Sequence, residues 1–308
     1  MDKKKLDPQV AEFLDGFAEQ LSPTEVSLEE SRKLLEEILP VLNLSVKKVE
    51  DLKIPDPAGE IPIRVYTPSN TKDVPVIVYY HGGGWSRGSL NTAENMCAAL
   101  ANKTGFIVVS VDYRLAPEHP YPAGIDDSYA ALKWISKNAK NFGGDNRHLA
   151  VAGDSAGGTM AAVMALRARN ENGPLIGLQV LICPAINLLE MNTPSYEICA
   201  KGYMLSKEWM EHYRDIYVPD STNWSDPYIS PLFEKDLSGL PPAVILTAEF
   251  DILRDEAETY GERLKNSGVP VVVSRYPGTI HDFLLLLPRI KASEKAFDEI
   301  ASVLKERL

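Results

Sequence analysis

Short runs rich in valine and isoleucine recur through the 308-residue chain, and longer amphipathic segments separate most of them. The runs predict buried strands at 61–66, 74–80, 106–111, 148–152, 176–183, 243–248 and 270–276. The segments between them predict helices at 92–103, 126–139, 156–170, 252–267 and 290–307. Buried strands that alternate with helices indicate a mostly parallel central sheet flanked by helices on both faces, an α/β fold.

The N-terminal part of the chain does not follow this alternation. Residues 8–20 and 27–42 predict two amphipathic helices, and Ser27 and Glu30 stand at capping-box spacing. The second helix is expected to bury one apolar face, formed by Leu34, Leu35, Ile38 and Leu39. A turn region is expected before the first strand, at Pro55, Pro57 and Gly59.

A second departure is the connection at residues 188–225, which is too long for an ordinary loop. It carries six aromatic side chains: Tyr196, Tyr203, Trp209, Tyr213, Tyr217 and Trp224. We expect this insertion, together with the N-terminal helices, to form a small helical cap over a site at the carboxyl ends of the strands. Tyr203, Met204, Trp209 and Met210 are candidates to line the pocket, with Trp85 nearby. Ordinary packing inside the cap explains them equally well, so none is assigned to the site.

Composition limits the classes of partner. The formal net charge of −11 argues against a nucleic acid, and the one basic run, Lys3–Lys5, is explained by a solvated terminus. Three cysteines without metal-like or redox-like spacing indicate reduced, partly buried thiols. The N-terminus does not read as a signal peptide, and no apolar stretch approaches the ~20 residues needed to span a bilayer. We therefore expect a cytoplasmic protein with no membrane partner.

The segment Gly153–Gly157, with sequence Gly-Asp-Ser-Ala-Gly, stands between a predicted strand and a predicted helix. A nucleophilic serine needs such a tight strand-to-helix turn, and the glycines avoid collisions with the neighbouring chain. About one chain in ten of this length would contain the pentapeptide by chance, so its placement carries the argument. The alternative is a plain turn in which Ser155 caps the helix.

A second glycine-rich segment, His81–Trp85, follows the strand at 74–80. Backbone N–H groups in a loop free of side chains stabilise the negative charge that acyl transfer places on the substrate oxygen. A phosphate-binding loop is the rival interpretation, but neither a Lys-Ser/Thr ending nor spaced glycines are present. His81 itself is expected to shape the loop by hydrogen bonding.

A general base is expected after a late strand. Of the five histidines, His281 alone stands in a loop after such a strand and before a terminal helix. The others are placed less suitably, at His81, His119, His148 and His212. Asp251 directly follows the strand at 243–248, so Ser155, Asp251 and His281 occur in the order that α/β-hydrolases use. Asp251 could instead cap a helix, and Glu249 or Asp255 could take its place.

Five blocks together make the chain resemble bacterial and archaeal esterases of the hormone-sensitive lipase family, over roughly residues 60–305. The blocks are His81–Trp85, Tyr113–Glu118, Gly153–Gly158, Asp251–Glu256 and His281–Phe283. The resemblance implies an α/β-hydrolase fold in which residues 51–308 form the catalytic domain, with the cap insertion at 188–225 and cap helices in residues 1–50.

The resemblance also implies roles for individual residues. Ser155 would be the nucleophile, His281 the base and Asp251 the acid that orients it. The backbone amides of the oxyanion hole would be those of Gly83, Gly84 and Ala156, with Gly82 as a further contributor. Asp282 stands where the family commonly has glycine, a difference expected to affect hydrogen bonding near the base.

The function that follows is a serine carboxylesterase acting on small esters with short- to medium-chain acyl groups. No metal or organic cofactor is implied, and a homodimer is possible because many members form dimers. The same machinery would also permit amide or lactone hydrolysis or acyl transfer to an alcohol. A receptor without catalysis is the remaining alternative, since plant gibberellin receptors resemble this family but lack the histidine that this chain has at position 281.

Overall fold

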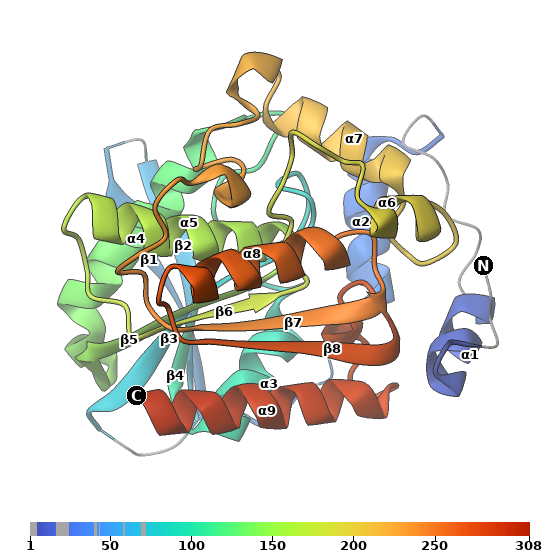
Figure 1. Ribbon diagram of the computed structural model, residues 1–308. Helices are drawn as coiled ribbons and strands as arrows, with labels where there is room; N and C mark the ends of the chain where they lie inside the picture. Colours follow the sequence, from blue (N-terminus) through green and yellow to red (C-terminus); the bar gives the residue numbers. More distant parts are fainter. Residues whose placement is uncertain (1–4, 17–24, 40–41, 43, 58, 69–71) are drawn as a thin grey trace.

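The computed structural model describes residues 5–16, 25–39, 42, 44–57, 59–68 and 72–308. They form an eight-stranded sheet in the order β1-β2-β4-β3-β5-β6-β7-β8 (Figure 1). The strands are β1 Lys48–Asp56, β2 Gly59–Thr67, β3 Val74–Tyr80, β4 Ile107–Val111, β5 Gly144–Asp154, β6 Leu178–Ile182, β7 Ala243–Phe250 and β8 Val271–Ile280. Pairing is antiparallel around β2 and parallel from β4 to β8. The predicted α/β fold with a mostly parallel sheet is confirmed.

Helices cover both faces of the sheet because successive side chains of each strand point to opposite sides. On one face Val78, Val151 and Ile245 belong to the same buried cluster as side chains of α4 (Ala123–Asn138), α5 (Ala156–Asn170) and α8 (Arg254–Asn266). On the other face Ile77, Ala150 and Leu246 pack with α3 (Glu94–Thr104) and α9 (Lys291–Arg307). Figure 1 shows these two helical layers on either side of the strands.

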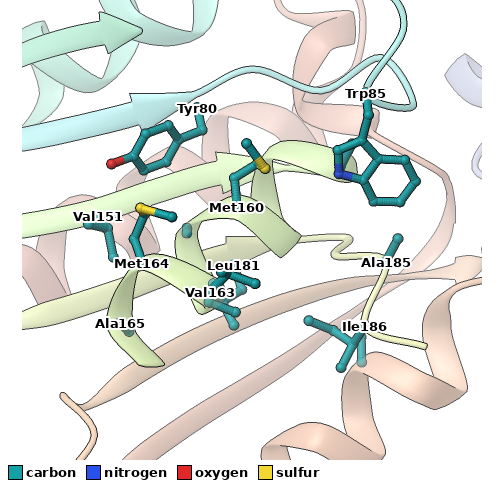
Figure 2. Close-up of a cluster of buried hydrophobic side chains, with 14 of the residues drawn as sticks. Tyr80, Trp85, Val151, Met160, Val163, Met164, Ala165, Leu181, Ala185 and Ile186 are labelled. Carbon is teal, nitrogen blue, oxygen red and sulfur yellow. The ribbon is translucent and has the colours of Figure 1, made fainter. Parts of the chain in front are cut away.

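The centre of the first layer is the packing of α5 on β5 and β6. Val163 of α5 lies beside Leu181 of β6 (Figure 2), and Met160 and Met164 of α5 belong to the same cluster; all four side chains are fully buried. Because this helix starts at the residue after Ser155, its packing fixes where the predicted nucleophile stands relative to the sheet.

Strand β1 was not predicted. Six of its nine residues are exposed, three of them charged, and only Ile54 is buried, so the hydrophobic pattern is faint. Pro55, which was expected in a turn, lies in this strand. A proline is tolerated there because β1 is at the edge of the sheet, where not every N–H group needs a partner.

The N-terminal helices are α1 (Pro8–Gly16) and α2 (Leu28–Ile38), and the predicted capping box of α2 is present. The prediction of which residues α2 buries was partly wrong, since the side chain of Leu34 is 41% exposed. Ser31 takes its place on the buried face with Leu39, eight residues later. The predicted segments 17–20 and 40–41, and the basic residues Lys3 and Lys4, lie outside the described residues.

The insertion at 188–225 contains α6 (Pro194–Ile198) and α7 (Lys207–Tyr217). In Figure 1 both lie at the upper edge of the molecule, beyond the strand ends of β6 and β7. Cys97, Cys183 and Cys199 are buried and form no disulfide. Among the described helices, none has the length and apolar character to cross a membrane.

We expect Leu181→Ala to lower the free energy of unfolding by about 2–5 kcal/mol, because it leaves a cavity beneath α5. Urea unfolding followed by circular dichroism measures this change. Leu175→Ala is the matched control, since that side chain is 82% exposed and its loss is expected to cost less than about 0.5 kcal/mol. Equal losses in the two variants would contradict the packing described above.

Candidate active site

Ser155 occupies the turn between β5 and α5 in a conformation that non-glycine residues rarely adopt, with φ 51° and ψ −119°. The turn is tight because Gly157 lies directly against the backbone of β3. A Cβ atom at Gly157 would collide with the carbonyl of Tyr80. The strained turn raises the serine hydroxyl above the carboxyl ends of the strands, the geometry expected of a nucleophile.

His281 links the serine to an aspartate. Its Nε2 lies 2.9 Å from Ser155 Oγ, and its Nδ1 lies 2.8 Å from Asp251 Oδ2. All three residues are buried: Ser155 is 7% exposed, His281 5% and Asp251 1%. Since a carboxylate only accepts, Nδ1–H donates to Asp251, and Nε2 accepts from the serine hydroxyl whenever it carries no proton itself. The structure thus brings together the three residues predicted from distant parts of the sequence.

The two carboxylates that competed with Asp251 have other partners. Glu249 Oε2 accepts the N–H of Gly278 at 2.7 Å, and Asp255 Oδ2 accepts the N–H of Ser195 at 2.8 Å. Asp251 also accepts the N–H of Leu253 at 2.9 Å through Oδ1. The N-cap residue of α8 is Leu253 and no side chain caps this helix, so Asp251 does not take the helix-cap role considered for it.

The remaining histidines lie elsewhere. His119 is exposed, and His148 contacts Asp145 at 2.9 Å near the start of β5. His212 lies on α7 against Trp209. His81 is buried, stacks on Tyr113 at 4.4 Å and donates from Nδ1 to the carbonyl of Gly82 at 2.9 Å. These contacts match the loop-shaping role expected of His81.

The glycine loop is joined to the serine turn by Asp154. Asp154 Oδ1 accepts the N–H of Gly82 at 3.0 Å and a short hydrogen bond from the hydroxyl of Tyr79. The N–H of Gly82 is therefore already used. Within the described part of the chain, no acceptor is found for the N–H groups of Gly83, Gly84 and Ala156.

Gly84 shows why this loop needs glycine. Its φ is +63°, and a Cβ atom there would overlap the ring of Tyr213 on α7. Trp85, which was expected near the substrate pocket, is 1% exposed and stacks on Tyr217 at 4.6 Å. Its indole points into the core beside Ala185 and Ile186 (Figure 2), so Trp85 does not line the cavity itself.

A narrow cavity of about 80 Å³ lies above Ser155 and His281. Its polar wall is formed by the glycine loop, Asp154, Asp282 and Arg87. Its apolar wall is formed by Leu35, Leu39, Met204, Leu205, Met210 and Leu285. The N-terminal segment and the 188–225 insertion thus both border the cavity.

Most of the apolar wall could not be assigned from the sequence. Leu35 belongs to α2, Leu39 is the C-cap residue of this helix, and Leu285 follows His281 by four residues. In the sequence, each of these leucines has the spacing of an ordinary core residue. The hydrophobic pattern therefore cannot distinguish a residue that lines a cavity from one that packs between helices. Tyr213 also lines the cavity, although its position on α7 gave no signal beyond amphipathicity.

Three buried carboxyl groups belong to the site, and two of them, Asp251 and Asp282, contact His281. Burial alone lowers the pKa of an imidazole, but the charges of Asp251 and Asp282 outweigh it and raise the pKa of His281 well above its usual 6.5. Burial and the charge of Asp282 raise the pKa of Asp154 to about 7. Burial also raises the pKa of Asp282, although the neighbouring imidazole opposes this shift.

One group of side chains among the described residues has the spacing of a metal site. Atoms of Cys183, Asp251 and His281 lie within 4.8 Å of one another. A metal requires the thiolate form of cysteine, and burial raises the pKa of the Cys183 thiol well above its usual value. The Nδ1–H of His281 is already donated to Asp251. The donor set suits a neutral thiol beside a hydrogen-bonded pair better than a metal.

A serine, a histidine and an aspartate joined in series at the ends of parallel strands, beside a glycine loop, define an α/β-hydrolase site. A family model described as alpha/beta hydrolase fold matches residues 77–285. The chain belongs to this family and to its group of hormone-sensitive-lipase-like esterases, as its motifs predicted.

Named relatives cover nearly the whole chain. Carboxylesterase NlhH of Mycobacterium tuberculosis is 41% identical over 313 residues, covering 98% of this chain and 96% of that protein. Ethyl acetate hydrolase of Pseudomonas putida is 33% identical over 268 residues, covering 84% and 83%. The structure of a hyperthermophilic esterase from the archaeon Pyrobaculum calidifontis aligns with a TM-score of 0.94 at 41% identity, covering 98% of both chains.

We expect His281→Gln to lower kcat/KM for p-nitrophenyl acetate by at least about 10³-fold, because glutamine cannot take up the serine proton. Steady-state kinetics at the pH optimum measures the loss. His119→Gln, at an exposed position, is the control and is expected to stay within about twofold of the unmodified chain. Similar losses in both variants would rule out His281 as the base.

Proposed function

We propose that this chain is a serine carboxylesterase that works through an acyl-enzyme on Ser155. The observation that carries the proposal is the continuous line from Ser155 Oγ through His281 to Asp251, with separations of 2.9 and 2.8 Å. The proposal agrees with the names of the relatives, which include a carboxylesterase and an ethyl acetate hydrolase. It also agrees with the class of enzyme predicted from the motifs.

In the first half of the reaction, Ser155 Oγ attacks the ester carbonyl while His281 Nε2 takes up the hydroxyl proton. The imidazolium then gives this proton to the departing alcohol, which leaves an acyl group on the serine. Water repeats the sequence in the second half and releases the acid. Asp251 keeps Nδ1–H in place and stabilises the positive charge of the ring.

The oxyanion would be held by the N–H groups of Gly83, Gly84 and Ala156. Two come from the loop after β3, and Ala156 is the first residue of α5, whose N-terminal dipole favours negative charge. Gly82 was the fourth predicted donor. Its N–H is donated to Asp154 in this structure, so the proposal rests on the other three.

The helix α2 and the 188–225 insertion would form the cap, because side chains from both regions border the cavity, whereas no residue of α1 does. The homodimer and the cytoplasmic location stay predictions. Three buried cysteines without a disulfide are consistent with a reducing compartment.

A receptor function is less well supported than catalysis. A binding site alone would not require a serine in a strained conformation with a histidine at hydrogen-bonding distance, and both are present here. Amide or lactone hydrolysis would use the same residues, but the names of the relatives favour esters.

We expect Ser155→Ala to abolish hydrolysis of p-nitrophenyl butyrate while the far-ultraviolet circular dichroism spectrum stays unchanged. The reason is that the acyl-enzyme cannot form without the hydroxyl. A fluorophosphonate probe, followed by intact-protein mass spectrometry, should label the unmodified chain once and the variant not at all. Retained turnover in the variant would exclude Ser155 as the nucleophile.

We expect activity to be highest for short to medium acyl chains in a series of p-nitrophenyl esters from acetate to palmitate. The apolar wall favours an alkyl chain, whereas the limited cavity should not accommodate the longest ones. kcat/KM for each ester, measured below its critical micelle concentration, tests this. A maximum at palmitate would contradict the assignment.

A further inference from the structure

The residue after the predicted base is an aspartate in a conformation that suits glycine. Asp282 has φ +50° and ψ 34°, in the left-handed region. Among residues with a side chain, aspartate and asparagine tolerate this region best, at a cost of about 1 kcal/mol. The backbone here therefore does not require a carboxylate, and a reason for one must come from what its side chain contacts.

The Asp282 carboxyl group contacts the reactive nitrogen of the base. Its Oδ2 lies 3.2 Å from His281 Nε2, the atom that also lies 2.9 Å from Ser155 Oγ. The Asp282 side chain is 8% exposed, and Oδ1 has no hydrogen-bond partner among the described residues. A buried carboxyl group with one oxygen unsatisfied is costly, so the contact with His281 is its main compensation.

The contact between Asp282 Oδ2 and His281 Nε2 is favourable only when a proton lies between the two atoms. An unprotonated Nε2 and an ionised Oδ2 both carry lone pairs and repel each other at this separation. Attraction needs either an imidazolium Nε2–H or a protonated carboxyl group. In both cases the nitrogen lone pair is occupied, and it is not available to take the proton of Ser155.

Other groups around His281 do not replace Asp282. Asp251 contacts Nδ1, on the opposite side of the ring. Cys183 is a neutral thiol because burial raises its pKa. Asp154 shares the cavity wall, but it accepts from Tyr79 and from the backbone. Within the described residues, no lysine or arginine forms an ion pair with Asp282.

Arg87 is a positive group on the cavity wall, but it has partners of its own. Its Nη1 donates to Ser31 Oγ at 2.8 Å, and its guanidinium stacks over Trp209 and Tyr213 at 5.4 and 5.0 Å from the ring centroids. The negative charge of Asp282 is therefore directed at His281.

We propose that Asp282 is a positioning residue that shares a proton with the Nε2 atom of His281, so that loss of this proton switches the esterase on as the pH rises. This inference rests on the proposed function, because it assigns His281 as the base. The raised pKa of His281 agrees with it.

The test is the pH profile of kcat/KM for p-nitrophenyl butyrate between pH 5 and 10. In the unmodified chain, we expect the acidic limb to have a midpoint above 6.5, because the protonated imidazole is inactive and its pKa is raised. Asp282→Gly and Asp282→Asn remove the charge, so both midpoints should fall by about one pH unit. Asp282→Gly suits the left-handed backbone, and Asp282→Asn keeps the side-chain shape.

The profiles of variant and unmodified chain should also cross. The variants should be more active at pH 6, where more of their base is neutral. They should be less active near pH 9, because His281 is neutral there in the unmodified chain and in both variants, and it is the weaker base in the variants. A merely structural role would lower activity by a similar factor at every pH. Asp298→Asn, which removes one charge from an exposed pair with Lys103, is the control and should leave the midpoint unchanged.

The rate of labelling by a fluorophosphonate gives an independent readout, because it reports the attack of Ser155 without deacylation. Its pH midpoint should shift by the same amount. Midpoints within about 0.2 unit of the unmodified chain in both Asp282 variants, with active protein in each case, would overturn the inference. If the unmodified chain neither hydrolyses the ester nor reacts with the probe at any pH, the proposed function fails instead.

Discussion

The structure depends on keeping one imidazole buried and correctly oriented between a hydroxyl and two carboxyl groups. Burial of charged groups is costly, and within the described residues no cation forms an ion pair with either carboxyl group except the imidazole itself. The arrangement is stable only if its geometry does not relax. The rigid parallel sheet provides this, because Ser155, Asp251 and His281 each directly follow a strand whose neighbours are packed on both faces.

Asp154 extends this rigidity to the glycine loop. By accepting from Tyr79 on β3 and from the N–H of Gly82, it fixes the loop relative to the serine turn of which it is itself a part. The close contact between Gly157 of α5 and the Tyr80 carbonyl of β3 holds the start of this helix against the same strand. Amides placed in this way do not have to reorganise when negative charge develops, which is the main source of stabilisation in such sites.

Sequence reasoning worked where burial dictates both pattern and position. β3 and α5 begin and end where they were predicted, because their residues are almost all buried. The three reactive side chains were found because the carboxyl ends of parallel strands meet at one edge of a sheet. It did not work where the signal lies in three-dimensional contacts alone. The exposed edge strand β1 has no apolar pattern, the tryptophan of the glycine loop turned into the core, and Leu39 reaches the cavity from a helix over 100 residues away from Ser155.

Asp282 illustrates the balance that a base must meet. A second carboxyl group beside an imidazole strengthens it as a base and so lowers the barrier to proton transfer once the ring is neutral. Each unit of raised pKa also reduces the neutral fraction about tenfold at a pH below the pKa, whereas the gain in basicity is only partly expressed in the transition state. The net effect is therefore a loss of rate in acidic and neutral solution and a gain in alkaline solution. A chain that carries glycine at this position avoids the loss and forgoes the gain, so the residue at position 282 selects the pH range in which the same triad works best.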